Sequence, residues 1–279
     1  MKKISRRSFL AAAGLSVAAL ALTACGGSSA STASSVASSA ASSEAASTSA
    51  AAGELTTVEA GKLTMATNAA FPPYEMTTDA GDFEGIDIET AQAIADKLGL
   101  ELQIDDMDFD AALLSVQQGK ADIVMAGVTV TDERKAVMDF SDSYATGIQS
   151  IIVPEGSDIA SPDDLAGKKI GTQRGTTGYI YCSDDFGDEN VVAYDDGLTA
   201  VQALNNGQVD AVVIDNAPAQ EFIAANPGLK ILDTSYAEED YAIGMAKGSS
   251  LEDAVNAALK ELKADGTLQS IVDKYITAE

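Results

Sequence analysis

The chain has 279 residues, yet it contains no histidine, no tryptophan and only two cysteines, Cys25 and Cys182. The lack of histidine argues against a zinc site, whose ligands are mainly imidazoles and thiolates. General acid–base catalysis would depend on carboxylates, and no serine or cysteine stands with a base in a recognisable nucleophile arrangement. We therefore expect no metal, no cofactor and no enzymatic activity, and we expect Cys182 to pack as a small hydrophobe.

Basic side chains are also scarce, because 17 Lys and Arg residues stand against 43 Asp and Glu residues and the formal net charge is -26. Residues 1–24 carry four of the bases and no acid, so removing them lowers the net charge to about -30. Such a charge argues against nucleic acid as a partner and against electrostatic adhesion to anionic lipid. It also keeps an exported protein soluble.

The apolar segment 9–24 is shorter than the roughly 20 residues of a membrane-spanning helix. It follows a basic head and ends in small residues, which is the pattern of an export signal over residues 1–24. Residues 5–10 (SRRSFL) also resemble a twin-arginine signal. Residues 22–25 (LTAC) resemble the lipobox of bacterial lipoproteins, in which the cysteine is lipidated and becomes the mature N-terminus. We expect lipid on Cys25, rather than an incidental cysteine in a discarded signal, and hence no intrachain disulfide.

Residues 26–53 consist almost entirely of Ser, Ala, Gly and Thr. Such a tract has too little apolar surface to form a core and behaves as a flexible tether, here spanning residues 25–55 together with Cys25. Its r.m.s. reach is roughly 30 Å. The folded part is therefore expected over about residues 56–279, which is long enough for one large domain or two lobes.

Beyond the tether, strand-like and helix-like segments alternate, which predicts an α/β fold. Residues 62–67 are a predicted strand, and residues 87–98 a predicted helix that stops at Gly99. Segments 113–125 and 201–213 resemble each other at an offset of 88 residues. Each contains the end of a helix, a glycine, an aspartate and a buried strand, so each half of the folded part is expected to contain one such unit.

The two strands of this repeat end in chemically different residues. One runs into Ala126 and Gly127, and the other runs through Ile214 into Asp215. Open α/β sheets bind ligands at the carboxyl ends of their strands, so the two ends are expected to form two faces of one cleft. Asp215 is a candidate counter-charge for a cationic ligand group. The alternative is that its side chain caps the helix that begins at Asn216.

Arg134 lies in the first turn of a short helix that begins at Asp132 and is capped by Thr131. Cations usually prefer the other end of a helix, so this position makes most sense if the helix end and Arg134 share an anion such as a carboxylate. The alternative is that Arg134 bridges surface acids. A second candidate anion site is Gly175-Thr176-Thr177-Gly178, where backbone N–H groups and hydroxyls gather at a predicted helix start.

Two phenylalanines stand near these strand ends. Phe71 precedes two prolines that stiffen the loop after the strand 62–67, and Phe109 begins a predicted helix. Core packing is the usual fate of phenylalanine, but a position beside two prolines suits a core poorly. We expect Phe71 and Phe109 to sandwich the flat or aliphatic part of a small ligand.

Five motifs occur in order between residues 61 and 275: TNAAFPPYE (67–75), GIDI (85–88), MDFD (107–110), GVTVTDER (127–134) and DFSD (139–142). Together they resemble the polar amino acid-binding proteins of bacterial ABC importers, which are family 3 solute-binding proteins. The resemblance implies a two-lobed periplasmic-binding-protein-like type II fold, with a mixed sheet flanked by helices in each lobe. It implies one lobe from residues 56–145 plus 242–279, a second from 146–241, and a ligand in the cleft between them.

The resemblance also implies roles for single residues. Arg134 would bind the α-carboxylate, helped by Thr129 and by the amides of Thr176 and Thr177. Asp215, with the carbonyl of Ala126 or Gly127, would bind the α-ammonium. The side chain of the ligand would lie between aromatic residues and reach polar groups; the residues concerned are Phe71, Tyr74, Phe109, Asn68 and Gln173.

One position departs from relatives that select cationic side chains, because these commonly have Asp where this chain has Asn68. That departure favours an uncharged polar ligand. A cationic amino acid is the alternative, and Met125, Glu75 and Asp108 are other side chains that could contribute to binding it.

The resemblance implies a lipid-anchored monomer on the outer face of the cell membrane that delivers an amino acid to the permease of an ABC importer. The alternatives are a sensor subunit for a membrane receptor and a dehydratase-like enzyme on the same fold.

Overall fold

The computed structural model describes residues 55–276. The export signal over residues 1–24, Cys25 and the tether up to residue 54 lie outside the described residues, so those expectations stay predictions. Within the described part, no helix is both long enough and apolar enough to cross a membrane.

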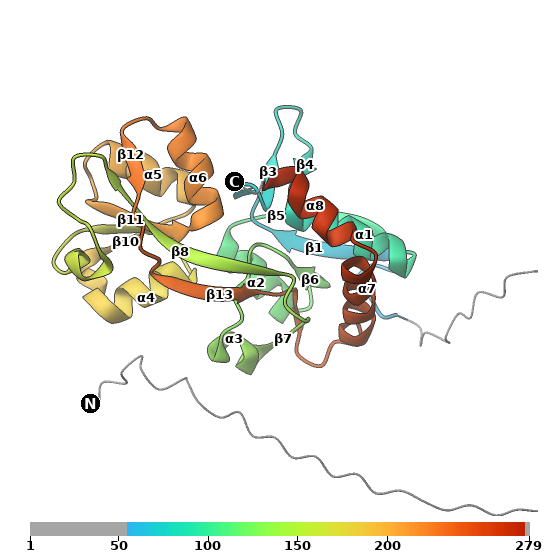
Figure 1. The fold of residues 1–279 in the computed structure, drawn as a ribbon. Helices are drawn as coiled ribbons and strands as arrows, with labels where there is room; N and C mark the ends of the chain where they lie inside the picture. Colours follow the sequence, from blue (N-terminus) through green and yellow to red (C-terminus); the bar gives the residue numbers. More distant parts are fainter. Residues whose placement is uncertain (1–54, 277–279) are drawn as a thin grey trace, which may run out of the picture. The chain divides into compact units, whose positions relative to one another are not determined.

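The first lobe is built on a five-stranded sheet in the order β5-β1-β6-β14-β7 (Figure 1). Its strands are β1 (Lys62–Thr67), β5 (Glu101–Asp106), β6 (Ile123–Val124), β7 (Met138–Phe140) and β14 (Gly244–Ala246). The first three run parallel, and β14 runs antiparallel to β6 and β7. A small antiparallel sheet lies beside it, formed by β2 (Ala70–Phe71), β3 (Glu75–Thr77) and β4 (Phe83–Glu84).

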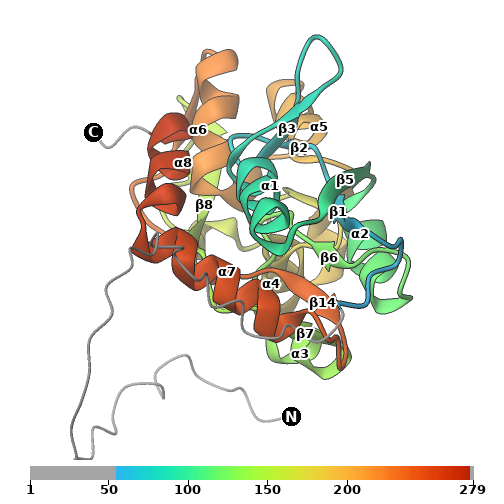
Figure 2. The same cartoon turned by 90° about the vertical axis from the view of Figure 1, so that its right-hand side faces the viewer.

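Helices cover this sheet, which explains why β1 is buried along almost its whole length. They are α1 (Ile86–Leu98), α2 (Phe109–Gln117), α3 (Asp132–Val137), α7 (Glu252–Ala264) and α8 (Thr267–Tyr275). The two C-terminal helices return to pack against α1 (Figure 2). The strand predicted over residues 62–67 is confirmed, and the helix that stops at Gly99 begins one residue earlier than predicted.

The second lobe has a six-stranded sheet in the order β10-β9-β11-β8-β12, and β13 pairs with β8. Its strands are β8 (Ala145–Pro154), β9 (Ile170–Gln173), β10 (Val191–Tyr194), β11 (Ala211–Asp215), β12 (Leu229–Ile231) and β13 (Ala237–Tyr241). Three α-helices pack on it: α4 (Thr177–Phe186), α5 (Gly197–Asn205) and α6 (Asn216–Ala225). Two short 3-10 helices complete the lobe, Pro162–Leu165 and Asp188–Asn190. Cys182 on α4 is buried in a hydrophobic cluster, as predicted for a cysteine that packs as a small hydrophobe.

Two antiparallel strands connect the lobes. β8 and β13 belong to the second sheet and run side by side from it toward the first lobe (Figure 1), in a register that pairs Ala145 with Tyr241 and Gln149 with Ala237. Both crossings of the chain are therefore hydrogen-bonded to each other over five residue pairs. A pair of linked strands can twist as a hinge while it keeps the two lobes in register.

The predicted repeat is present in both lobes with the same local geometry. Gly119 and Gly207 follow α2 and α5 with φ of 65° and 66°, a left-handed conformation that favours glycine. Three residues later, Asp122 and Asp210 each accept a backbone N–H from a neighbouring segment, Thr64 at 2.7 Å and Lys169 at 2.7 Å. The repeated aspartate therefore fixes the entry of each buried strand into its sheet.

Candidate functional site

A cavity lies between the two sheets, at the carboxyl ends of their parallel strands. Every ligand-binding residue expected from the sequence lines it, except Tyr74. The lining residues are Asn68, Phe71, Glu75, Phe109, Ala126, Gly127, Thr129, Arg134, Gln149, Gln173, Thr176, Thr177, Val213, Ile214 and Asp215. Asn68 follows β1, whereas Gln173 and Asp215 end β9 and β11, so strand ends of both lobes meet here, as the topology requires.

Arg134 enters the cavity from α3. The side chain of Thr131 caps this helix by accepting the N–H of Arg134 at 3.1 Å, as predicted. The guanidinium donates to the carbonyl of Thr129 at 2.8 Å and, across the lobes, to that of Gly175 at 3.2 Å. It also lies 5.4 Å from the ring centre of Phe109. These contacts hold the group in place and leave further N–H donors for an anion.

The pKa of Arg134 is lowered by burial, and the charge of Glu239 opposes this shift. The guanidinium stays protonated, because arginine side chains do not lose their proton in proteins. Arg134 is therefore a buried positive charge and does not bridge surface acids, since its side chain is only 8% exposed.

Asp215 supplies the opposite charge from the second lobe. Its carboxylate accepts hydrogen bonds from the hydroxyl of Tyr241 and, at 2.8 Å, from the amide of Gln149. Its side chain makes no capping bond to α6, so the capping alternative is not realised. Burial raises the pKa of Asp215 to about 7. The hydrogen bond from Tyr241 acts to lower this pKa, and the negative charge of Glu239 acts to raise it. A cation in the cavity would favour the ionised carboxylate.

The carboxylate of Glu239 contacts side chains of both lobes next to Arg134 and Asp215. One carboxylate oxygen accepts from the hydroxyls of Thr129 at 3.1 Å and Thr177 at 3.0 Å, and from the amide of Gln149 at 3.0 Å. Glu239 and Gln149 were not predicted from the sequence. The sequence AEEDY of β13 gives no local sign of this role, because only the pairing of the strand makes Glu239 and Tyr241 buried and Glu238 and Asp240 exposed.

Polar side chains also meet at the Asn68 side of the cavity. Gln173 donates to the side-chain oxygen of Asn68 at 2.8 Å, and Asn68 donates to the carbonyl of Met107 at 2.9 Å. Thr176 stands at the N-cap of α4, where its hydroxyl accepts the N–H of Tyr179 at 3.3 Å. The first turn of α4 therefore faces the cavity with its positive end.

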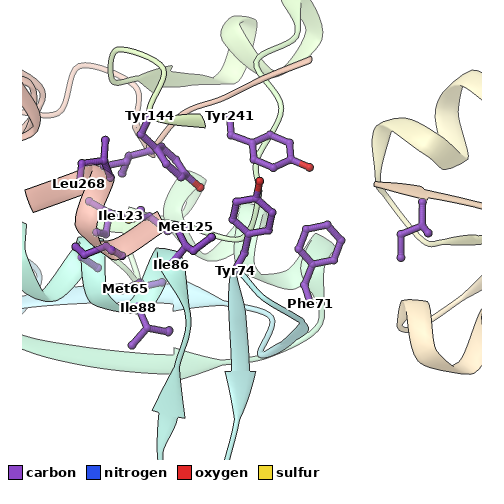
Figure 3. Packing of buried hydrophobic residues seen from close by; sticks show 14 of the residues in the cluster. Met65, Phe71, Tyr74, Ile86, Ile88, Ile123, Met125, Tyr144, Tyr241 and Leu268 are labelled. Carbon is purple, nitrogen blue, oxygen red and sulfur yellow. The ribbon is translucent and has the colours of Figure 1, made fainter. Parts of the chain in front are cut away.

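The aromatic residues divide into two groups. Phe71 and Phe109 line the cavity, whereas Tyr74 is buried behind Phe71, stacked on it with ring centres 5.9 Å apart (Figure 3). Tyr74 also meets Tyr241 edge to face at 5.3 Å. Its place is thus in the packing that supports the cavity. A Cβ at Gly127 would lie 2.8 Å from the ring of Phe71, so glycine allows this close approach.

Of the three other side chains considered for a cationic ligand, only Glu75 lines the cavity. Met125 is fully buried in the hydrophobic core. Asp108 stands at the N-cap of α2.

Comparison with known proteins agrees with this geometry. Residues 63–278 match the model of the bacterial extracellular solute-binding proteins, family 3. The chain belongs to this family. Its members are extracytoplasmic binding proteins for solutes such as amino acids, which are taken up by ABC importers.

Individual relatives support the same family. The chain is 33% identical over 226 residues to the L-cystine-binding protein TcyJ of Escherichia coli strain K12, covering 79% of this chain and 85% of TcyJ. It is 33% identical over 228 residues to the arginine-binding extracellular protein ArtP of Bacillus subtilis strain 168, covering 78% of this chain and 87% of ArtP. Among solved structures, the arginine-, lysine-, histidine-binding protein ArtJ of Geobacillus stearothermophilus superposes with a TM-score of 0.75 at 34% identity, covering 78% and 96% of the two chains. The two-lobed fold expected from the sequence is thereby confirmed.

Proposed function

We propose that this family member binds a polar L-amino acid between its two lobes and delivers it to the permease of an ABC importer. One observation carries the proposal: Arg134 and Asp215 are opposite charges, each only 8% exposed, that line one cavity from different lobes. A free amino acid carries the matching pair of charges. Relatives named for cystine, for arginine and for arginine, lysine and histidine support an amino acid as the ligand.

In this proposal Arg134 binds the α-carboxylate, together with Thr129 and the amides of Thr176 and Thr177. Asp215 and the carbonyl of Ala126 or Gly127 bind the α-ammonium. Phe71 and Phe109 flank the ligand side chain, and Asn68 and Gln173 reach its polar atoms.

The physical reason for closure is the cost of burying a zwitterion. Taking both charged ends out of water is unfavourable unless each meets an opposite charge. Since Arg134 and Asp215 belong to different lobes, only the closed arrangement supplies both. The ligand thus stabilises the closed state by contacting both lobes.

The same proposal covers attachment and partners. Lipid on Cys25 anchors the chain to the outer face of the cell membrane, and the tether lets the domain reach the permease. The chain acts as a monomer of two lobes, residues 56–145 plus 242–279 and residues 146–241. It returns its ligand chemically unchanged and is not an enzyme.

Titration calorimetry with a panel of L-amino acids tests this function. The variants Arg134→Ala and Asp215→Ala should each lose about 2–5 kcal/mol of binding free energy, because each leaves one charge of the ligand unpaired. Lys135→Ala on the same helix and Asp233→Ala, both at exposed positions, are matched controls and should bind like the unchanged protein. Unchanged affinity in either cavity variant would remove that residue from the site, and conversion of the ligand to a new compound would contradict a pure binding role.

A further inference from the structure

The motif GIDI (85–88) begins α1 but contributes none of the described residues that line the cavity. The N–H of Asp87 donates to the carbonyl of Tyr74 at 2.8 Å, which docks the start of α1 onto the segment before β3. A Cβ at Gly85 would lie 2.2 Å from the same carbonyl oxygen, so only glycine allows this approach. The motif thereby fixes the side chain of Asp87 beside the small sheet.

The carboxylate of Asp87 is fully buried and holds the cavity wall from behind. One of its oxygens accepts the N–H of Gly127 at 3.0 Å and the hydroxyl of Tyr144 at 2.8 Å. Its chain neighbours Ile86 and Ile88 pack in the same core as Tyr144 (Figure 3). Since Gly127 lines the cavity and Asp87 does not, Asp87 contacts this wall from the side opposite to the cavity.

The bond to Gly127 fixes the direction of a neighbouring carbonyl. A peptide unit is planar and trans, so the N–H of Gly127 and the C=O of Ala126 point in opposite directions. Because the N–H points at Asp87, the carbonyl of Ala126 points away from Asp87, toward the cavity that Ala126 and Gly127 line. A charge-assisted bond to the N–H also polarises the peptide unit, which makes the carbonyl oxygen a stronger acceptor.

A proton on Glu75 completes the hydrogen bonds of Asp87. Among the described residues, the second oxygen of Asp87 and both oxygens of Glu75 have no donor, although the two carboxyl groups are in hydrogen-bonding contact. Burial, and then the charge of Asp87, raise the pKa of Glu75 well above its usual value, so Glu75 is protonated and donates to Asp87. Burial raises the pKa of Asp87 to about 6, and the hydrogen bonds from Gly127 and Tyr144 act to lower it. Asp87 is therefore the charged member of the pair at pH 7.

We propose that Asp87 is a positioning residue for amino acid binding, which aims the carbonyl of Ala126 at the α-ammonium of the ligand through the N–H of Gly127. The inference rests on the proposed function and refines it, since it selects Ala126 from the two carbonyls and adds a residue that does not touch the ligand. Asp215 then meets the ammonium from the second lobe and Ala126 meets it from the first. Because every α-amino acid with a primary amine carries this ammonium, the contribution of Asp87 is independent of the ligand side chain.

Proton–nitrogen NMR of the ligand-free protein tests the positioning directly. The amide proton of Gly127 should resonate downfield and exchange slowly with solvent, because it donates to a buried carboxylate. It should move upfield in Asp87→Leu, which has a similar shape but no acceptor. It should keep most of its shift in Asp87→Asn, which retains an acceptor oxygen and can donate its amide to Glu75. Gly119, whose N–H bonds to Val116, is the internal reference and should not move.

An unchanged Gly127 resonance in Asp87→Leu would overturn the proposal. Should that variant not fold, the unchanged protein decides, because a Gly127 amide that exchanges as fast as an exposed one would contradict the bond to Asp87.

Titration calorimetry with L-arginine, L-glutamine and L-histidine as probes measures the consequence for binding. Asp87→Leu should lower the affinity about tenfold for each probe that the unchanged protein binds, and Asp87→Asn should restore it to within about threefold. Asp96→Leu, at an exposed position later on α1, is the matched control and should bind like the unchanged protein.

Two outcomes of the calorimetry would overturn the assignment of Asp87. One is a loss that differs between the probes, which would place the effect at the ligand side chain. The other is an affinity of Asp87→Asn as low as that of Asp87→Leu, which would mean that the restored hydrogen bonds do not matter. Failure of the proposed function is distinct, because then no amino acid binds the unchanged protein although the Gly127 resonance responds as expected.

Discussion

The hydroxyl of Tyr241, at the end of β13, donates a hydrogen bond to the carboxylate of Asp215, at the end of β11. Tyr241 is fully buried and pairs with Ala145, where the chain first crosses between the lobes. The proposed ammonium-binding carboxylate is therefore held by a residue of the connecting strands. Gln149 on the other connecting strand holds the second oxygen. Both strands of the hinge thus orient the same group.

Tyr241→Phe should weaken amino acid binding about tenfold, because Asp215 loses a hydrogen bond that favours its ionised form. The fold should remain, since the ring still packs on Tyr74. Calorimetry at pH 7 measures the change. Tyr275→Phe is the control, because that hydroxyl bonds to Gly85 and Glu89, neither of which lines the cavity. Equal loss of affinity in both variants would contradict a specific role for Tyr241.

Gly147→Ala should destabilise the protein by about 1–3 kcal/mol through overpacking. A Cβ at this buried position of β8 would lie 2.5 Å from the ring of Tyr241. Gly156→Ala, where no atom lies within 4 Å of the added Cβ, should have little effect. Chemical denaturation measures both, and equal stabilities of the two variants would show that Tyr241 moves aside without cost.

The stability of the ligand-free protein should fall as pH rises from about 4 to 7. Burial raises the pKa of Asp215 to about 7 and that of Asp87 to about 6, against ordinary values of 3.8. In this range the folded state holds protons that the unfolded state has released, so raising the pH favours unfolding. The pKa values of Asp139, Asp164 and Asp265 are lowered, so these groups make the folded state more stable as the pH rises. Their effect falls at or below about pH 4.

Melting temperatures between pH 5 and 8 check this dependence. Asp215→Asn should flatten the curve, because it removes one of the buried titrating groups. Ligand affinity should change in the opposite direction and rise over the same range, since an ammonium needs the ionised Asp215. Stability that increases steadily up to pH 8 would contradict the assignment.

Much of the site was predictable because its residues stand at the ends of elements with strong local signals. The strand 62–67, the glycine after α1 and the cap at Thr131 are encoded locally, and each appears where expected. Since the carboxyl ends of parallel strands meet at one edge, locating the strands was enough to bring Asn68, Gln173 and Asp215 together.

The repeated aspartates give a further prediction about these local units. Asp122→Ala should cost more stability than Asp210→Ala, because Asp122 is buried and accepts two backbone N–H groups, each at 2.7 Å, from Val58 and Thr64. Asp210 is exposed and accepts one, from Lys169. The first variant should lose about 1–3 kcal/mol and the second less than about 1 kcal/mol. Urea denaturation measures both stability losses. A larger loss for Asp210→Ala than for Asp122→Ala would contradict this interpretation of the two aspartates.

The supporting residues could not be found in the same way. Gln149 meets Asp215 because β8 and β11 pair antiparallel in a register that sets these two residues opposite each other. The register brings together two residues that are 66 positions apart in the chain, so the local sequence around either residue does not predict their contact. Glu239 and Tyr241 depend likewise on the pairing of β13 with β8, and the burial of Glu75 depends on how the small sheet packs.

A crystal structure of the protein with a bound L-amino acid tests the central claim most directly. It should show the α-carboxylate on the guanidinium of Arg134 and the α-ammonium on Asp215, with both lobes in contact with the ligand. A ligand bound outside the cavity, or bound with its carboxylate away from Arg134, would contradict the account.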